Sequence, residues 1–422
     1  MTGCTVALPA FVISGSILLA TAGASSAQTL QDDPDAPPPT VSRYDEDWSR
    51  YCETTTQALA FKCMDVAGGE LTLGLGARLR YEIYDPTAFG RGPQDGDGYW
   101  LTRAAGHAAL TLSPRWRVFG QLFTANAVGR AGGPRPADRN EFDLVQGFLE
   151  WRPTGDDGAF VRFGRQEIAF GAGRLLAASE GSNVRRQFDG VRVSVRRGDV
   201  TYQAVASGLV QVRPGVLDDS ASFDRSLWGV GAVHATPDGS TNAVYYIAAR
   251  RPDRIFGSPP SIQDRQTLGG RIVRQSARWF GELEVIGQGG EAGGLDVDAW
   301  ATAGEGAFLT RVGAVRLRAA LRFSAASGDG DATDRRLEGF DPLFPNPTYT
   351  GSVPLISPTN TVSLNPRVTA TWASNQRLSG DVAVIRRLEA SDRIYAFSGV
   401  AIPAAPDAGD DVGALWSIGW SQ

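Results

Sequence analysis

Apolar and polar residues alternate strictly along many stretches of this chain, beginning near Glu70. Residues 71–84 read LTLGLGARLRYEIY, where an apolar side chain occupies every second position and glycine, threonine, arginine or glutamate lies between. Residues 190–197 (GVRVSVRR) and 315–323 (VRLRAALRF) repeat the pattern. Because successive side chains of a strand point to opposite faces, this period of two predicts β-strands with one apolar and one polar face.

Arginine recurs at every second position on the polar face of several of these strands. The arginines that the alternation places there include Arg78, Arg80, Arg192, Arg316 and Arg318. Several unpaired charges inside a dry β-sandwich would each cost kilocalories, whereas water inside a wide barrel solvates them. The alternation therefore predicts a barrel whose outer face contacts lipid and whose arginines line an aqueous lumen.

Short turn sequences alternate with long polar connections between the expected strands. We expect turns at Ser113-Pro114, Arg197-Gly198-Asp199, Pro237-Asp238-Gly239 and Ser374-Asn375, and long loops over residues 85–98, 127–140, 211–225, 251–264 and 325–358. Outer-membrane barrels have short periplasmic turns and long extracellular loops. The predicted fold is all-β, a single large antiparallel transmembrane β-barrel, and the pattern gives about sixteen strands.

Tyrosine and tryptophan recur near the expected strand ends. Examples are Tyr84, Tyr99, Trp151, Trp228 and Trp279. Such residues form girdles where a barrel meets the membrane surface, so we expect them on the outer face.

The first residues of the chain differ from the rest. Residues 6–24 are apolar and precede Ser25-Ser26-Ala27, so we expect a signal peptide over residues 1–27, with a transmembrane anchor as the alternative. Residues 28–69 begin with an acidic, proline-rich stretch and are expected to form a flexible periplasmic segment. The barrel is expected over residues 70–422. The chain stops at residues 420–422 (WSQ) without a terminal aromatic residue, which leaves two interpretations, a missing last hairpin or an unusual ending.

Cysteine content and charge narrow the picture further. Cys52 and Cys63 lie close together in the exported segment, where we expect a disulfide, with two unpaired thiols as the alternative; Cys4 falls in the expected leader. The formal net charge of −5 argues against a nucleic-acid partner. Lys62 is the single lysine, so nearly every cation is a guanidinium, which binds carboxylates in a fork.

Two stretches resemble the alginate-export porin family. Residues 161–193 (VRFGRQEIAFGAGRLLAASEGSNVRRQFDGVRV) are similar to the Gly-Arg-Gln, Gly-x-Gly-Arg-Leu, Asn-Val-Arg and Phe-Asp-Gly-Val elements of that family. Residues 327–368 are similar to its long loop, with Phe-x-Pro-Leu-Phe-Pro and Tyr-x-Gly elements. The similarity extends from about residue 70 to the end of the chain.

The resemblance implies a monomeric barrel of about eighteen strands in the outer membrane of a Gram-negative bacterium. It also implies an arginine-rich constriction that passes a polyanionic uronic-acid chain. The matching positions, which we add to the expected pore lining, are Arg165, Arg174, Arg185, Arg186 and Asp189 in the first stretch and Arg335 and Arg367 around the second. Each of these arginines has an alternative interpretation, as a solvated wall residue paired with a neighbouring carboxylate.

Two functional hypotheses remain, besides an enzymatic alternative that we do not favour. The first is a channel for an anionic polysaccharide such as alginate, and the second is a general or uptake porin for small anionic or aromatic solutes. His107 and His234 are the only histidines and lie far from any nucleophile or metal-ligand motif, so we expect no enzyme and no cofactor. Alternating oxygen ligands over residues 328–334 (GDGDATD) leave Ca²⁺ binding there as a further alternative.

Overall fold

A computed structural model describes most of the chain. The described residues are 11–12, 15–17, 37, 40, 42–46, 48–54, 61–66, 68–85, 93–155, 158–254, 260–346, 356–372, 376–402 and 409–421. The expected turn at Ser374-Asn375 lies outside them.

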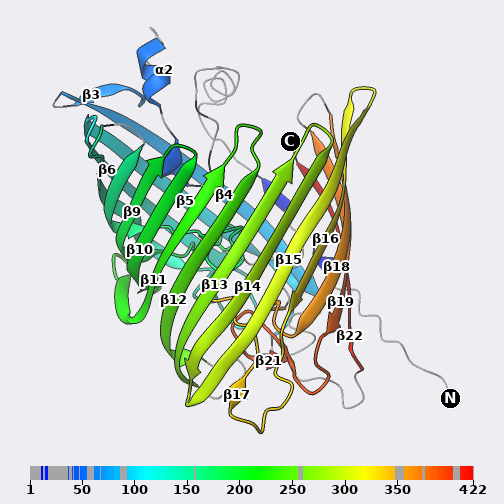
Figure 1. Cartoon of the computed structure of the whole chain (residues 1–422). Coiled ribbons are helices and arrows are strands. Elements are labelled where there is room, and N and C mark those ends of the chain that lie inside the picture. The colour runs from blue at the N-terminus through cyan, green and yellow to red at the C-terminus, as the bar shows by residue number, and fades with distance from the viewer. Residues whose placement is uncertain are drawn as a thin grey trace.

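The described residues form one 20-stranded sheet, which curls into a barrel (Figure 1). Sixteen of its strands are eight residues or longer and build the wall: β4 (Gly69–Asp85), β5 (Asp95–Ser113), β6 (Trp116–Val128), β7 (Asn140–Trp151), β8 (Ala159–Gln166), β9 (Phe188–Arg197), β10 (Val200–Gln211), β11 (Ser220–Ala235), β12 (Thr241–Arg254), β13 (Ser261–Gln275), β14 (Trp279–Ala292), β15 (Leu295–Val312), β16 (Val315–Ala326), β18 (Thr361–Thr371), β19 (Arg377–Arg387) and β22 (Asp411–Ser421). The short strands of the sheet are β1 (Phe11–Val12), β2 (Gly15–Ile17), β3 (Met64–Val66) and β17 (Arg336–Leu337), and β20 (Ile394–Tyr395) pairs separately with β21 (Ala401–Ile402). The predicted all-β barrel is confirmed.

Wall strands that follow one another in the chain pair antiparallel, from β4 through to β22. Within the described residues, β22 pairs only with β19, and the free edge of β4 pairs with β1, β2 and β3. The short strands β1 and β2 fall inside the expected leader. A strand edge presents unpaired backbone groups, which explains why short segments add to it.

Alternation separates the two faces of the wall as the sequence predicts. On β13, Arg265 is fully buried toward the barrel interior, whereas Leu268, three residues further along the strand, is 60% exposed on the outer face. Many large apolar side chains of the described residues are exposed on the outer face of the barrel, including Leu75, Phe163 and Ile418. An apolar belt of this kind suits contact with lipid.

Short turns gather at one end of the barrel and long connections at the other (Figure 1). The connections 114–115, 198–199, 236–240, 276–278 and 313–314 lie at the first end. The described residues of the long connections, 129–139, 167–187, 327–346, 356–360, 388–402 and 409–410, lie at the second. The turn at residues 293–294 is a short one at the long-loop end. The expected turns at residues 113–114, 197–199 and 237–239 are confirmed.

The aromatic residues near strand ends divide between the two faces. Trp151, Trp228 and Trp279 are 41%, 52% and 62% exposed on the outer face, as a membrane girdle requires. Tyr99 is instead 2% exposed and stacks on Tyr84 at 6.2 Å between ring centroids. For these two tyrosines the girdle prediction is wrong, because strand parity turns them toward the interior, where the Tyr99 hydroxyl donates to Glu82.

Part of the chain before β4 forms a small cap at the short-turn end. It contains the helix α2 (Ser49–Thr54) and β3, and the 3₁₀ turn η1 (Arg43–Asp45) precedes it in the chain. Cys52 and Cys63 are joined by a disulfide, with 5.4 Å between their Cα atoms. Among the described residues, no helix combines the length and apolar character needed to cross a membrane.

Candidate functional site

Two long connections fold into the barrel and meet there. We call residues 167–187, between β8 and β9, the first inner loop, and the described residues 327–346 and 356–360, between β16 and β18, the second inner loop. Leu176 and Phe344 form a parallel bridge, and the Ala177 amide donates to the Phe344 carbonyl at 3.0 Å. Leu175, Leu176, Phe340 and Phe344 then pack with apolar side chains of the wall in the largest hydrophobic cluster. The interior is therefore partly filled, and any path through it runs past these loops.

Glycine allows the first inner loop to approach the wall closely. Gly171 has a φ of 60°, and a Cβ at this position would collide with the carboxylate of Glu284. Next to it, Arg174 donates to Glu282 at 2.5 Å and to Glu284 at 2.7 Å, both on β14. One guanidinium thus fixes the loop to two carboxylates of the wall.

The second inner loop is fixed by one buried carboxylate. Asp341 is fully buried and contacts Arg251 and Arg254 of β12, the latter at 3.2 Å, with Arg265 of β13 at 4.0 Å. Burial opposes its ionisation, but these three guanidinium groups hold the pKa of Asp341 well below its usual range. The second inner loop is therefore held in place by an ionic cluster, which forms only when Asp341 packs against β12 and β13.

Arginines of β4 and β5 bind residues 180–182 of the first inner loop. Arg78 donates to the carbonyls of Glu180 and Ser182 at 3.0 and 2.8 Å, and Arg80 to that of Gly181 at 2.8 Å. Arg103 forms an ion pair with Glu180 at 2.5 Å. These guanidinium groups lie in the interior, where they orient loop backbone.

A cavity of about 480 Å³ lies where three of the long connections converge on the ends of β11 and β12. Its charged lining residues are Arg186, Arg225, Arg251, Arg254 and Asp253. Asp253 pairs with Arg225 at 2.5 Å, whereas Arg186 has no carboxylate partner among the described residues and donates to the Ser179 hydroxyl at 3.0 Å. Burial beside Arg254 lowers the pKa of Arg186 to about 10, so its guanidinium stays charged at neutral pH. The cavity carries an excess of positive charge.

A second group of arginines lies on the interior face of β16 and β18. Arg318 and Arg322 share the single carboxylate of Glu305. Arg367 lies opposite Ala320, and hence diagonal to both arginines, in the strand register. Its other cross-strand neighbour is Asp381, whose oxygens accept hydrogen bonds from Asn365 and Ser417.

The remaining residues of the predicted lining lie in different environments. Arg165 pairs with Asp189 at 2.8 Å, and the register places both on the face of Phe163, which is 65% exposed on the outer side. Arg192 lies on the interior face and donates to Gln203 at 3.3 Å. Arg185 pairs with Glu167 at 2.7 Å inside the first inner loop. Arg316 is exposed at the short-turn end of β16, and Arg335 is exposed in the second inner loop.

Sequence reasoning missed Arg225, Arg251, Arg254 and Arg265. Their strands do not alternate arginine with apolar residues, so they lack the signal that marked β4, β9 and β16. The pair Arg250-Arg251 held a weak clue, because one of two adjacent strand arginines must face inward.

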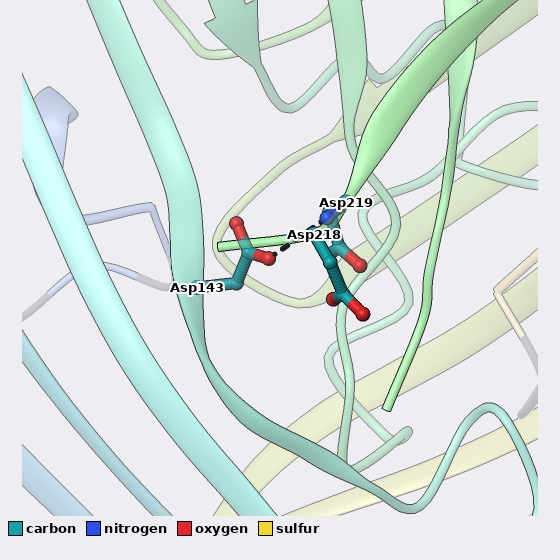
Figure 2. A group of neighbouring side chains, drawn as sticks. All are labelled: Asp143, Asp218 and Asp219. Carbon is teal, nitrogen blue, oxygen red and sulfur yellow. Dashed lines mark hydrogen bonds between the residues drawn. The ribbon is translucent and has the colours of Figure 1, made fainter. Parts of the chain in front are cut away.

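Three carboxylates gather at the long-loop end of the wall (Figure 2). Ligand oxygens of Asp143, Asp218 and Asp219 lie within 4.8 Å of one another, the one such group with metal-ligand spacing in the described part of the chain. The Asp219 amide donates to Asp143 at 3.0 Å, and Arg165 lies 3.6 Å from Asp143. Arginine therefore already offsets part of this negative charge. Residues 328–334, where Ca²⁺ was an alternative, are not part of this group.

The two histidines lie on opposite faces of the wall. The ring of His107 stacks on Phe119 in the interior at 5.8 Å, and His234, on the outer face, lies 3.5 Å from the side chain of Asn242. Within the described residues, no hydrogen bond joins either histidine to a hydroxyl or a carboxylate.

Solved structures with a similar fold are outer-membrane porins. OccD3 (OpdP) of Pseudomonas aeruginosa matches with a TM-score of 0.50 and 13% identity, over 76% of this chain and 72% of that one. OccK2 (OpdF) of the same organism, solved with glucuronate, matches with a TM-score of 0.48 and 14% identity, over 76% and 82%. No curated protein matches the sequence.

The family comparison is more direct. The model of the alginate export family matches residues 69–417, which cover the whole described wall apart from its last few residues. The predicted family and its extent are confirmed. The long loops are therefore extracellular and the short turns periplasmic. The chain belongs to the alginate export family and forms a channel in the outer membrane of a Gram-negative cell.

Proposed function

We propose that this channel passes an anionic polysaccharide of the alginate type, and that guanidinium groups of the interior form its path. The observation that carries the proposal is the cavity around Arg186. Its lining holds four arginines and Asp253, and Asp341 behind Arg251 and Arg254 is the second carboxylate that they contact, so positive charge remains in excess. The arginines of β16 and β18, with Glu305 between them, extend the positive surface along the wall. The path proposed here leaves out Arg165 and Asp189, because the strand register puts them on the same face as the exposed Phe163.

The chemistry of a uronate polymer suits such a path. Each sugar carries a carboxylate, and a guanidinium replaces its lost hydration with charge-assisted hydrogen bonds. Many moderate sites in series let a chain slide, whereas one tight site would hold it. Carboxylates such as Glu282 and Glu305, which occupy part of the arginine donors, keep each site moderate.

A second candidate is a porin for small anionic or aromatic solutes. The observation that favours it is the size of the cavity, about 480 Å³, which is typical of a small-molecule site. Phe344 and Phe397 line the same cavity and offer apolar faces to a ring. The two candidates share the arginines and differ in whether one bound group or a long chain occupies them.

Planar-bilayer recording of the purified full-length protein separates the candidates. We expect an anion-selective current that oligomers of a uronic acid block at concentrations well below those needed for the monomer. Block by monomeric uronate or benzoate at equal carboxylate concentration would favour the small-solute porin. A cation-selective current would contradict both.

A matched pair of variants tests the cavity. Arg186→Gln removes the guanidinium that has no carboxylate partner among the described residues, and we expect it to weaken block about tenfold, or ~1.4 kcal/mol, close to the lower end of the range for a charged hydrogen bond. Arg250→Gln is the control, because Arg250 is exposed on the outer face and pairs with Asp264 at 3.2 Å. Equal block of the two variants would exclude the cavity as the binding site.

A further inference from the structure

A short segment before α2 lies inside the barrel, and we call residues 42–46 the inner segment. Tyr44 is 6% exposed, and its ring meets those of Phe119 and Phe148 edge-on, at 6.0 and 5.7 Å between centroids. Both phenylalanines are buried on the interior face of β6 and β7. Contacts with these two strands place the Tyr44 side chain inside the barrel rather than below its periplasmic end.

Arginines of the same wall surround the inner segment. The Arg162 guanidinium of β8 lies 4.4 Å from the ring centroid of Tyr44 and is itself held by Glu150 at 2.5 Å. Asp45 follows Tyr44 directly and is exposed, and the guanidinium groups that act most on its carboxylate are those of Arg162 and Arg192, ahead of Arg117. The wall therefore presents aromatic faces and guanidinium groups side by side, and the inner segment offers them a ring and a carboxylate.

The inner segment also reaches the first inner loop. The Ser42 hydroxyl donates to Glu167 at 2.9 Å, and Glu167 is the carboxylate that pairs with Arg185. Behind it, Glu46 is 6% exposed and contacts Arg43 and the backbone amide of Thr40, which keeps the segment compact. The chain thus extends from the periplasmic end of the barrel to the base of the first inner loop.

The cap holds the inner segment near the periplasmic mouth. The Cys52–Cys63 disulfide closes a short loop next to α2, and the Lys62 amine lies 4.1 Å from the ring centroid of Trp48. These contacts hold the cap that follows the inner segment, whereas the contacts of Tyr44 with the wall are non-covalent. Such contacts can be exchanged for those of another ligand with the same chemistry.

We infer that Phe119, Phe148, Arg162 and Arg192 form a binding site for a ring that carries a carboxylate, and that Tyr44 and Asp45 are its resident ligand. The inner segment then narrows the path until a cargo of that chemistry displaces it from the wall. Uronate sugars have both features, so the inference extends the proposed function to the periplasmic half of the channel. The site itself does not depend on which anion the channel carries.

The test compares full-length protein with the double variant Tyr44→Ala/Asp45→Asn. Glu53→Gln is the control, because Glu53 is exposed on α2 and its substitution removes the same charge outside the lumen. Trypsin cleavage after Arg43 reports whether the inner segment has left the wall, and bilayer conductance reports the width of the path. Heat-modifiable migration on gels shows that each variant is folded, and Asp45→Asn alone is a milder substitution should the double variant not fold.

We expect the double variant to be cleaved faster after Arg43 and to conduct about twofold more current than the wild type, with the control unchanged. The inference would be overturned if the wild type were cleaved after Arg43 as fast as the double variant. It would also be overturned if the double variant were cleaved faster but conducted the same current as the wild type. The reversal potential in a salt gradient is recorded in the same experiment. The sign of the reversal potential tests anion selectivity. A failure of the proposed function is therefore distinguished from a failure of the inference about the inner segment.

Discussion

Arg254 and Asp341 lie 3.2 Å apart and join a wall strand to a loop 87 residues further along the chain. Arg251 contacts the same carboxylate, and Arg265 lies close to it. The arrangement shows that some interior arginines hold the second inner loop in place in addition to facing the lumen.

Substitution Asp341→Asn should therefore release the second inner loop and destabilise the barrel. Removing one member of a buried ionic cluster leaves the other charges uncompensated, at a cost of about 3–5 kcal/mol. The measurement is urea unfolding in detergent or lipid, followed by tryptophan fluorescence.

Asp264→Asn is the matched control for that experiment. Asp264 and its partner Arg250 are each 51% exposed in their side chains, so their ion pair contributes about 0–1 kcal/mol. If both substitutions changed the free energy of unfolding equally, Asp341 would have no special role in seating the loop.

The second inner loop should loosen as the pH rises through about 6. Burial and the charges of Asp392 and Glu338 raise the pKa of Asp329 to about 6. The folded state then holds this proton more tightly than the unfolded state, so the stabilisation is complete below about pH 4 and is lost as the pH rises through 6. Hydrogen exchange of peptides over residues 327–334 measures the change.

Asp329→Asn should remove that pH dependence, because an amide does not titrate in this range. Asp331→Asn should retain it, since Asp331 is exposed and its pKa is lowered by hydrogen bonds from Thr333. A pH profile that is the same in wild type and Asp329→Asn would assign the effect to another group.

The wall of the barrel could be predicted from the sequence because its signal is local. A period of two fixes which face each side chain takes, and the alternation in residues 71–84 and 315–323 assigned Arg78, Arg80 and Arg318 to the interior as observed. The count of about sixteen strands agrees with the long strands described. The same parity, applied to Phe163 and Arg165, would have placed Arg165 on the outer face.

The inner loops could not be predicted because their contacts are distant in sequence. Arg251 and Asp341 are separated by 90 residues, and Ser42 and Glu167 by 125. A polar loop that folds into an aqueous lumen has the same composition as one that extends into solvent. The family motifs marked the two loops that meet inside the barrel but carried no information about their direction.

Lys62 should react with amine-selective reagents at a lower pH than an ordinary lysine. Burial lowers its pKa to about 8, against the opposing charge of Glu46. Acylation should thus reach half its maximum near pH 8, whereas a free lysine would do so near about 10.4. Mass spectrometry of the peptide that contains Lys62 gives the profile, and unfolded protein should show the ordinary value.

Arg165 and Arg367 should affect ion selectivity differently, although both belong to the sequence-predicted pore lining. Arg367 lies on the interior face of β18 beside Arg318 and Arg322, so Arg367→Gln should lower the ratio of anion to cation permeability. In the register of β8 and β9, Arg165 is at a position that faces outward, where it pairs with Asp189. Arg165→Gln should therefore leave the permeability ratio unchanged.

The two substitutions should also differ in stability, in the opposite order. Arg165 is 10% exposed in its side chain and donates to Asp189 as well as to the carbonyls of Leu144 and Asp219, so its loss should cost about 1–3 kcal/mol. Arg367 donates no hydrogen bond among the described residues, and Arg367→Gln should be close to neutral. Reversal potentials and unfolding curves of both variants give the two measurements. A shift in selectivity with Arg165→Gln would mean that its side chain reaches the lumen, against the register of β8 and β9.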